Sequence, residues 1–418
     1  MEEKMSVLGD AQEIIKAAIR QVLPGESVKR ELQGYKPPAG RLYVVSVGKA
    51  AYTMAVAAKE VLGDQIHSGI VITKYGHIKG EMEGFSCFEG GHPTPDENSF
   101  LAAEKALELT KNLTREDEVL FLLSGGASAL FEKPMIPGEE LLDITKQLLA
   151  CGADITEINI VRKHLSCVKG GRFARWCMPA HVHSVILSDV VGGRLDSIGS
   201  GPACVDLSTS GQAMEVVKKY GIRLSAEAEN ALRQETPKRL ENTSYCMIGD
   251  VKLLCEAAAG KCRELGYETQ ILTDSLSCEA KEAGSFLSAI ARTHDKTGKS
   301  LAFIAGGETV VHLSGTGKGG RNQELALSAA EGLMGLHEVC IFSVGSDGTD
   351  GPTDAAGGIV DAHTACRLKA AGIDIYQTLR DNNAYYALQA ADGLVVTGPT
   401  GTNVNDVAVL LIKRRERA

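Results

Sequence analysis

Short apolar runs alternate with amphipathic helical stretches along almost the whole chain of 418 residues. The first half contains expected strands at 42–47, 69–73, 118–123 and 184–187, each separated from the next by a helical stretch or a turn. This alternation is typical of strands joined by crossover helices, which makes neighbouring strands parallel. The sequence therefore predicts an α/β fold with mostly parallel sheets.

The alternation weakens between Asp206 and Thr243, where turn-forming and charged residues gather, and then it resumes. A chain of 418 residues is also too long for one ordinary hydrophobic core. We therefore expect two α/β domains with the boundary near residue 240. Residues 1–240 should form a Rossmann-like domain and residues 241–418 a second α/β domain, with an active-site cleft between them.

Composition narrows the choice of partners. The formal net charge of −9 argues against nucleic acid or an anionic membrane as a main partner. The longest apolar runs, such as Val407–Ile412, are strand-sized and far shorter than a membrane span. The eleven cysteines stand singly, without a C-x-x-C pair, which fits a reducing cytoplasm better than a disulfide framework or a zinc site. We expect a cytoplasmic protein with a small-molecule substrate, and the oligomeric state stays open.

Polar loops follow three strands of the first half. Ligands in an open α/β sheet bind at the carboxyl ends of the strands. Lys49 follows strand 42–47 at a helix start, where an ammonium group suits phosphate, although it could equally be a surface lysine. Asp189 follows strand 184–187 and could bind Mg²⁺, accept a proton or cap a turn. The loop after strand 118–123 combines small and hydroxyl residues that could form an anion site or a tight turn: Ser124, Gly125, Gly126, Ala127 and Ser128.

The second half has three further polar loops, at 315–324, 345–354 and 397–403. The first is basic and rich in glycine, the second contains three aspartates, and the third contains threonines and an asparagine. Together such loops could hold phosphate, Mg²⁺ and a polyhydroxy acid, and we favour this functional interpretation over a purely structural one.

Gly315, Gly317 and Gly320 satisfy the pattern G-x-G-x-x-G of dinucleotide-binding proteins. That pattern requires a strand directly before it. Here the glycines follow an expected hairpin of strands 301–305 and 309–313, and Lys318 crowds the loop with positive charge. We therefore do not infer a nicotinamide site.

Two groups of residues receive structural interpretations. His92, in the segment 91–97, could reach a site or hold a proline-rich loop in place, and we favour the second interpretation. Four basic residues are expected to form a solvated helical face: Arg162, Lys163, His164 and Lys169.

Ten motifs, which run in order along the chain, resemble those of the class II glycerate kinases, the glycerate 2-kinases with a carboxy-terminal MOFRL domain. The matching segments are VGKAA (47–51), TKYGH (73–77), GHPTPDE (91–97), LLSGGAS (122–128), VRKHLSCVKGGR (161–172), LSDVVG (187–192), GGETVVH (306–312), GGRNQELALS (319–328), GSDGTDGPTDAAGGIVD (345–361) and TGPTGTNVND (397–406). Ala127 stands where the family often has glycine, and Gly199 where alanine is usual. Both departures keep small residues.

The resemblance implies transfer of the γ-phosphoryl group of ATP to the 2-hydroxyl of D-glycerate, with Mg²⁺. It places the family's catalytic lysine and arginine at Lys49 and Arg321. We add Asp189 as base or metal ligand, with Asp350 and Asp354 as further metal ligands. The expected nucleotide-binding residues are Ser124, Gly125, Gly126, Ser128, Gly317, Lys318, Gly319 and Gly320. The expected substrate-binding residues are Glu308, Asn322, Asp347, Asp350, Thr400 and Asn403.

Two alternatives remain at this stage. An NAD(P)H-dependent hydroxypyruvate reductase would use the glycine loop at 315–320 for its cofactor. A non-catalytic metabolite-binding protein would need the anion loops but not both Lys49 and Arg321. For the kinase, we also expect Arg321 to face solvent, so that its replacement would not affect folding.

Overall fold

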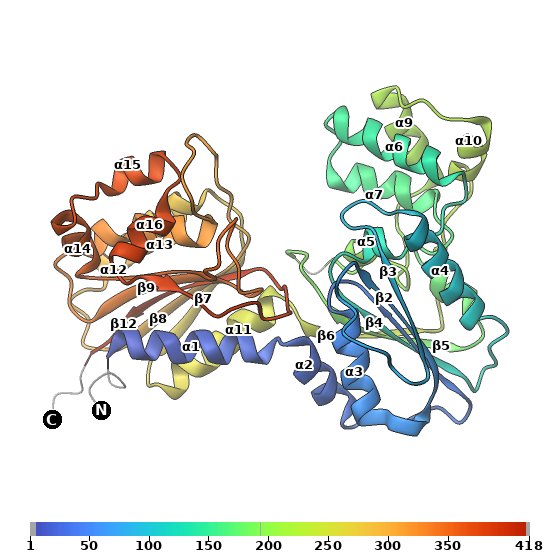
Figure 1. Cartoon of the computed structure of the whole chain (residues 1–418), viewed down its shortest axis with the longest axis horizontal. Helices are drawn as coiled ribbons and strands as arrows, with labels where there is room; N and C mark the ends of the chain where they lie inside the picture. The colour runs from blue at the N-terminus through green and yellow to red at the C-terminus, as the bar shows by residue number, and fades with distance from the viewer. Residues whose placement is uncertain (1–5, 193, 415–418) are drawn as a thin grey trace. The chain divides into compact units, whose positions relative to one another are not determined.

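The computed structural model describes residues 6–192 and 194–414 (Figure 1). They form two compact units. The N-terminal unit consists of Pro24–Ile248, and the C-terminal unit combines the described residues up to Leu23 with those from Gly249 onward.

The strands of the N-terminal unit are β1 (Leu42–Val47), β2 (Ile66–Lys74), β3 (Phe85–Gly90), β4 (Glu118–Leu123), β5 (His181–Leu187) and β6 (Thr243–Gly249). Its helices are α2 (Pro24–Leu32), α3 (Ala51–Leu62), α4 (Glu97–Leu109), α5 (Ala127–Leu130), α6 (Gly138–Ala150), α7 (Ile155–His164), α8 (Arg172–Trp176), α9 (Ser210–Tyr220) and α10 (Ala226–Leu232).

The strands of the C-terminal unit are β7 (Glu268–Leu276), β8 (Leu301–Gly307), β9 (Val339–Gly345), β10 (Gly357–Asp361), β11 (Leu394–Val395) and β12 (Asp406–Ile412). Its helices are α1 (Val7–Gln21), α11 (Val251–Glu264), α12 (Ala280–Thr293), α13 (Arg321–Leu333), α14 (Thr364–Ala370), α15 (Ile375–Arg380) and α16 (Ala384–Ala390).

The sheet of the N-terminal unit has the strand order β3-β2-β1-β4-β5-β6. The pairings of β3 with β2, β2 with β1, β1 with β4 and β4 with β5 are parallel. Strand β1 is buried along its whole length, which explains its nearly continuous apolar sequence. This order is the Rossmann order, in which the chain reverses direction across the sheet between β1 and β4. The predicted Rossmann-like α/β architecture is confirmed.

Four helices of the N-terminal unit, α6, α7, α9 and α10, form a layer with its own apolar core (Figure 1). Leu148 of α6, Val161 of α7 and Leu232 of α10 are fully buried in it. This layer contains the polar stretch that we expected to be a domain boundary. Its low apolar density reflects short helices that each bury one narrow face.

The sheet of the C-terminal unit has the order β11-β10-β9-β12-β8-β7 and is mixed. Only the described pairing of β7 with β8 is parallel, and the other four are antiparallel. Strand β12 lies between β8 and β9 and runs against both. The prediction of mostly parallel strands therefore fails for this sheet. The alternation in the sequence agrees with β8 and β9 running in the same direction. It could not show that the last strand inserts between them.

Two segments lie in a different unit from the one expected. Helix α1 belongs to the C-terminal unit, where it packs against α11 and, on Figure 1, lies on the sheet face opposite α13. Asp10 of α1 accepts hydrogen bonds from the Tyr267 hydroxyl at 2.5 Å and the Lys413 ammonium at 2.6 Å. Strand β6 joins the N-terminal sheet instead of opening the second. The expected limits 1–240 and 241–418 miss both features because they divide the chain only once.

The expected hairpin strand at 309–313 is wrong. After β8 the chain has no regular strand there, and only Val310 forms an isolated parallel bridge, with Glu279.

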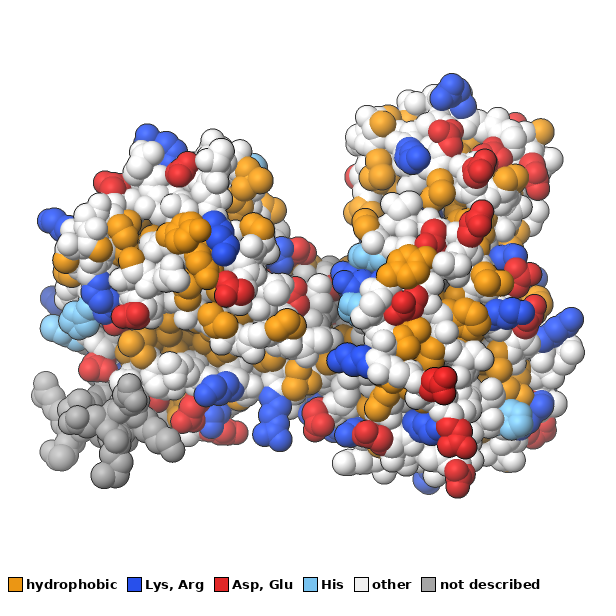
Figure 2. Space-filling model, in the orientation of Figure 1, with side chains coloured by type: hydrophobic (Ala, Val, Ile, Leu, Met, Phe, Trp, Pro, Cys, Tyr) orange, Lys and Arg blue, Asp and Glu red, His pale blue; other side chains and the backbone are white. Residues whose placement is uncertain are grey.

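Among the residues described, none of the helices has the length and apolarity needed to cross a membrane. On the face shown in Figure 2, acidic and basic side chains are interspersed.

Candidate active site

The loops after β1 and β4 are joined at the point where the strand order reverses. Val47 lies opposite Leu123 at the ends of the two paired strands. The Lys49 amide donates to the Gly125 carbonyl at 2.8 Å, and the Ala50 amide donates to the Ser124 hydroxyl at 3.1 Å. The backbone at Lys49 is therefore fixed against the glycine loop. In Rossmann-like sheets this switch point is where ligands bind.

Three candidate side chains lie next to the two glycines of this loop. Gly126 has a φ of +86°, and a Cβ there would lie 3.1 Å from Nε2 of His92 and 3.2 Å from Cγ of Lys49. A Cβ at Gly125 would collide with the carboxylate of Asp189. Both positions thus need glycine, because side chains of other loops occupy the adjacent space. The structure places Lys49, Asp189 and the 124–128 loop in one site, and adds His92.

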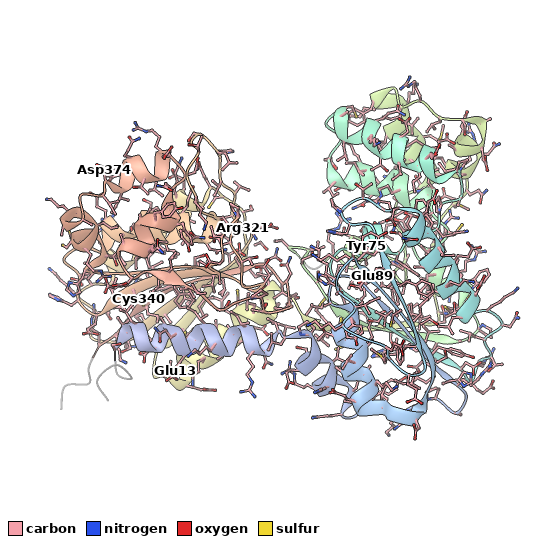
Figure 3. All side chains as sticks on the ribbon, viewed as in Figure 1. Glu13, Tyr75, Glu89, Arg321, Cys340 and Asp374 are labelled. Atoms are coloured by element: carbon pink, nitrogen blue, oxygen red, sulfur yellow. The ribbon has the colours of Figure 1, made fainter. Side chains whose placement is uncertain are left out.

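For His92, the interpretation that we favoured was that it holds its loop in place. That loop is held by other residues: the Asp96 carboxylate accepts hydrogen bonds from the Ser99 amide at 2.9 Å and the Tyr75 hydroxyl at 2.6 Å. Tyr75 is labelled in Figure 3. Burial, with the positive charges of Lys49 and Lys74, lowers the pKa of His92, so the imidazole is neutral at pH 7. Recognising β3 as a strand would have revealed that His92 follows a strand end.

Two basic side chains donate hydrogen bonds to the backbone carbonyl of Ser128. Its carbonyl accepts a hydrogen bond of 2.8 Å from Nη2 of Arg162 and another of 2.8 Å from Nζ of Lys169. The Lys169 ammonium also donates to the Phe131 carbonyl at 2.9 Å and lies 3.4 Å from the carboxylate of the fully buried Glu132. Burial lowers the pKa of Lys169 to about 8, so most molecules keep the charge at pH 7.

The expected solvated face on this stretch is wrong. Lys163, His164 and Lys169 are all buried. Lys163 lies 3.1 Å from Asp196 and 3.3 Å from Asp206. The carboxylates that pair with these lysines come from distant parts of the chain, so the local sequence pattern could not reveal them.

Arg321 is the first residue of α13, and it is labelled in Figure 3. Its Nε donates to Asp406 Oδ2 at 2.6 Å, its Nη2 to Asp406 Oδ1 at 3.1 Å, and its Nη1 to Glu308 Oε1 at 2.8 Å. Burial alone lowers the pKa of Arg321. The hydrogen bonds to Asp406 and the negative charges of Asp406 and Glu308 outweigh this effect and raise the pKa. The guanidinium is therefore a fixed cation, and the expectation that it simply faces solvent is wrong.

Asp350 holds the start of α13. Its carboxylate accepts hydrogen bonds from the backbone amides of Asn322 at 3.2 Å and Gln323 at 2.9 Å. Burial raises the pKa of Asp350 to about 6. Asn322 is also buried, and its side-chain oxygen accepts from the Ser343 hydroxyl at 2.6 Å. The structure gives these two expected substrate ligands a supporting position beneath Arg321.

The loop at 315–320 packs against the turn at 381–383. The Gly317 amide donates to the Asp381 carbonyl at 2.8 Å, and the Lys318 amide donates to Oδ1 of Asn383 at 3.0 Å. The Lys318 ammonium lies 3.9 Å from the centre of the Tyr385 ring. Gly317 and Lys318 therefore fix the loop against residues 381–385. Gly319 and Gly320 lead directly into α13, so their positions beside Arg321 remain the more suitable ones for a ligand.

The remaining expected residues of the C-terminal unit fall into two places. A Cβ at Gly345 would lie 3.2 Å from the Asp347 carboxylate and 3.3 Å from that of Asp406, so Asp347 is close to the partner of Arg321. Thr400 and Asn403 belong to the same region: the Thr400 amide donates to the Asp347 carbonyl at 3.1 Å, and the Asn403 side chain accepts from the Asn405 amide at 3.4 Å. Asp354 is exposed and accepts from the Tyr385 hydroxyl at 2.8 Å.

The predicted metal ligands do not converge within either unit. Asp350 and Asp354 make separate contacts in the C-terminal unit, and Asp189 lies in the N-terminal unit. Across the described ranges 6–192 and 194–414, no group of three His, Cys, Asp or Glu side chains is placed to hold a metal ion. Mg²⁺ in nucleotide enzymes is usually held by only one or two carboxylates together with phosphate oxygens and water.

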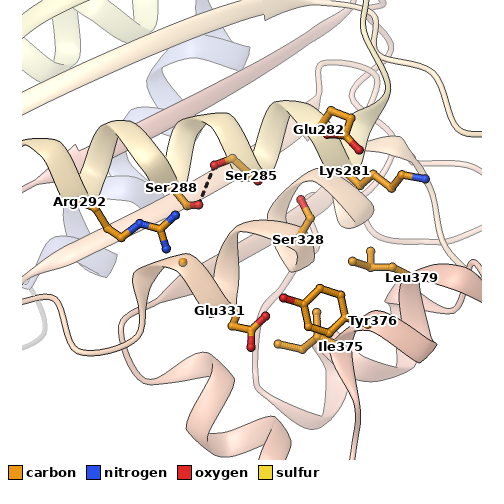
Figure 4. Close-up of a pocket in the computed structure, with 11 residues that line it drawn as sticks. Lys281, Glu282, Ser285, Ser288, Arg292, Ser328, Glu331, Ile375, Tyr376 and Leu379 are labelled. Atoms are coloured by element: carbon orange, nitrogen blue, oxygen red, sulfur yellow. Dashed lines mark hydrogen bonds between the residues drawn. The ribbon is translucent and has the colours of Figure 1, made fainter.

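Among the described residues, cavities are found inside each unit. One, of about 460 Å³, lies between α12, α13 and α15 of the C-terminal unit (Figure 4). Its lining includes Arg292, Ser288 and Glu331, but none of the predicted site residues. The other, of about 910 Å³, lies in the N-terminal unit and reaches Ser128.

The chain matches known proteins over most of its length. Residues 10–233 match a family described as a domain of unknown function (DUF4147), and residues 301–406 match the MOFRL family. The chain is 52% identical to a D-glycerate 2-kinase of Thermotoga maritima, over 96% of this chain and 97% of that one. A crystal structure of glycerate kinase from the same organism superposes with a TM-score of 0.93 and covers 97% of this chain and 99% of that one, at 51% identity.

One relative carries the name of the rival activity. A protein of Agrobacterium vitis named as a hydroxypyruvate reductase is 39% identical over 96% of this chain and 93% of its own length. The fold does not favour that activity here, because the glycines at 315–320 do not follow a strand directly and partly pack on the turn at 381–383. The match to the two family domains and to the kinases extends over both units. The chain therefore belongs to the class II glycerate kinase family, the glycerate 2-kinases that carry a MOFRL domain.

Proposed function

We propose that the protein transfers the γ-phosphoryl group of ATP to the 2-hydroxyl of D-glycerate and so forms 2-phosphoglycerate. The observation that carries this proposal is the position of Lys49 beside Gly125 and Gly126 at the switch point of a Rossmann-like sheet. The identity of 52% to a D-glycerate 2-kinase supports the choice of substrate.

Phosphoryl transfer depends on positioning and on charge stabilisation more than on covalent chemistry. In this proposal the Ser124–Ser128 loop lies along the nucleotide phosphates, and the Lys49 ammonium contacts the transferring group. Replacing Gly125 or Gly126 by any other residue would fill the space that the phosphates need and would displace Asp189 or His92.

Asp189 is the proposed base or metal ligand. Its carboxylate lies against Gly125, close to where the phosphates would lie, and a carboxylate oxygen is the ligand that Mg²⁺ prefers. When bound, Mg²⁺ would neutralise charge on the nucleotide phosphates. His92, which is neutral at pH 7, is a second group near enough to the glycine loop to accept the proton of the substrate hydroxyl.

Arg321 is the proposed cation from the C-terminal unit. A guanidinium has five N–H donors, and three of them are used by Asp406 and Glu308, which leaves one on Nη1 and one on Nη2. Two N–H groups on neighbouring nitrogens suit the paired oxygens of a phosphoryl group. The proposed contacts for the substrate are Asp347, Thr400, Asn403 and Glu308. In this proposal Asn322 and Asp350 hold Arg321 in position.

The kinase and the reductase are separated by one pair of assays. The purified protein should form ADP from ATP and Mg²⁺ only when D-glycerate is present. It should not oxidise NADH or NADPH when hydroxypyruvate is supplied. Steady consumption of NADH without ATP, together with no glycerate-dependent ADP, would overturn the proposal.

A further inference from the structure

The cavity of about 910 Å³ in the N-terminal unit begins at Ser128, where the glycine loop 124–128 ends. Ser128 is part of its lining, and Val190 and Val191, which follow Asp189, form part of its wall. Residues of α7 also line the cavity, among them Ile155, Asn159 and Ile160. A ligand whose phosphates lie over the glycine loop could therefore continue into this space.

The cavity is much larger than glycerate needs. Its volume of about 910 Å³ is at the upper end of the range for small-molecule sites and far exceeds what a three-carbon acid fills. The proposed reaction has one other substrate, the nucleotide, and the part of it that the glycine loop does not contact is the nucleoside.

The apolar lining suits a flat ring. Ile155 and Leu207, which line the cavity, are 67% and 84% exposed, although large aliphatic side chains usually avoid water. Ile160, Val190 and Leu195 add further aliphatic surface. Amide and hydroxyl groups lie among them, including Asn159, whose Oδ1 accepts from Ser200 at 3.3 Å and whose amide nitrogen is left to donate elsewhere.

The charges in the cavity are distributed unevenly. Lys163 pairs with Asp196 and Asp206, and Arg194 pairs with Asp196 at 3.0 Å, so these groups neutralise one another. Arg162 instead donates to the Ser128 carbonyl, and among the described residues its buried Nε has no hydrogen-bond partner. Arg162 and Lys169 share the single buried carboxylate of Glu132, so an excess of positive charge remains at the Ser128 end, where the phosphates would enter.

We propose that this cavity, which is lined by residues of α7 and by residues within 190–191 and 194–208, holds the base and ribose of the phosphoryl donor. The proposal rests on the ATP-dependent kinase activity proposed above, and it assigns the nucleoside to the N-terminal unit alone. It implies that the donor is recognised in two parts, with triphosphate bound along the glycine loop and a nucleobase bound by aliphatic side chains.

The test fills the cavity without touching the glycine loop. Thr156 is an exposed residue of α7 that lines the cavity, and Leu207 is an exposed loop residue that also lines it. Thr156→Trp and Leu207→Trp would each place an indole in the cavity. Asn230→Trp is the matched control, because Asn230 is an exposed polar residue of α10 in the same helical layer and does not line the cavity.

Binding would be measured by calorimetry on the full chain with three probes: a non-hydrolysable ATP analogue, adenosine, and inorganic tripolyphosphate. Wild type and Asn230→Trp should bind all three. Thr156→Trp should lose adenosine binding, weaken binding of the ATP analogue at least tenfold and keep tripolyphosphate binding, with a raised KM for ATP and a kcat within about twofold of wild type. Leu207→Trp should behave in the same way, which covers the case in which Thr156→Trp fails to fold.

If folded Thr156→Trp and Leu207→Trp both bind the ATP analogue and adenosine as wild type does, while glycerate-dependent ADP formation persists, the cavity assignment is wrong and the kinase activity stands. If wild type forms no ADP with glycerate but its binding of adenosine is lost in both variants, the proposed function fails and the cavity assignment stands.

Discussion

Arg321 illustrates how a catalytic candidate depends on its neighbours. Asp406 and Glu308 bind three of its N–H groups and fix the direction of the other two. The position of Arg321 at a glycine-rich helix start could be predicted from the sequence. Its pairing with Asp406 could not, because Asp406 opens a strand 85 residues further along that inserts beside β8 and β9.

Replacing Arg321 should therefore affect both catalysis and folding. In Arg321→Ala, kcat should fall on the order of a thousandfold, as for arginines that bind the transferring phosphoryl group. Arg321→Lys should recover little, because an ammonium cannot copy the bidentate contact with Asp406. Steady-state kinetics with D-glycerate and ATP provide the measurement.

The same change should cost about 2–3 kcal/mol of folding free energy, below the loss for a fully buried pair because the Arg321 side chain is 33% exposed. Adding Asp406→Asn to Arg321→Ala should restore stability in urea unfolding but not kcat. A near-normal kcat with only a raised KM for glycerate would mean that Arg321 binds the substrate carboxylate and has no catalytic role.

Asp189 should be needed together with Mg²⁺. Chelation by EDTA should abolish turnover, and Mg²⁺ or Mn²⁺ should restore it. Asp189→Asn should lower kcat by about a hundredfold or more, whereas Asp64→Asn, at an exposed site of the same unit, should not. Partial recovery of Asp189→Asn by excess Mg²⁺ would identify a metal ligand, and a loss independent of Mg²⁺ would identify a base. Full activity of wild type in excess EDTA would contradict the metal requirement.

At the scale of elements, the short helix α5 and its glycine loop rest on buried charges. Lys169 holds the carbonyls of Ser128 and Phe131, and Glu132 supplies its counter-charge. The burial of these charges was missed because an amphipathic pattern describes only the helix itself. The strands below the loop were easier to predict: β1 and β4 have the expected limits, since parallel strands buried on both faces are continuously apolar.

Removing one partner of this buried pair should be costly. Lys169→Met should lower the free energy of unfolding by about 3 kcal/mol, because Glu132 would lose the ammonium that lies 3.4 Å from it and keep only its interaction with Arg162. The double variant Lys169→Met with Glu132→Leu should recover much of that loss in urea unfolding. It should still show a raised KM for ATP, since Ser128 loses one of its two supports. Unchanged stability of Lys169→Met would show that the pair does not support the loop.

At the scale of the whole molecule, the sequence predicted two α/β units but not the path of the chain between them. A single cut near residue 240 cannot describe a chain whose first helix belongs with its last strands. Helix α1 is amphipathic, and its pattern predicts a helix, but the sheet that it covers cannot be read from its own residues. The sheet that α1 covers is determined by contacts with residues that are far from α1 in the sequence.

The position of α1 predicts a stability effect confined to one side of the helix. Ile14 is fully buried and Lys16 is exposed. Ile14→Asp should destabilise the C-terminal unit by about 3 kcal/mol or more, because a carboxylate would replace apolar core. Lys16→Asp should change stability by less than about 0.5 kcal/mol. Equal melting temperatures for the two variants would contradict the packing of α1.

The most direct test of the central claim is the position of the phosphate in the product. Protein incubated with D-glycerate, ATP and Mg²⁺ would be examined by proton-coupled phosphorus NMR. Phosphate on the 2-hydroxyl couples to the single methine proton and gives a doublet, whereas phosphate on the 3-hydroxyl couples to two methylene protons and gives a triplet. The kinase proposed here predicts a glycerate-dependent doublet. A triplet would contradict transfer to the 2-hydroxyl, and the absence of any new phosphate ester would contradict the kinase activity itself.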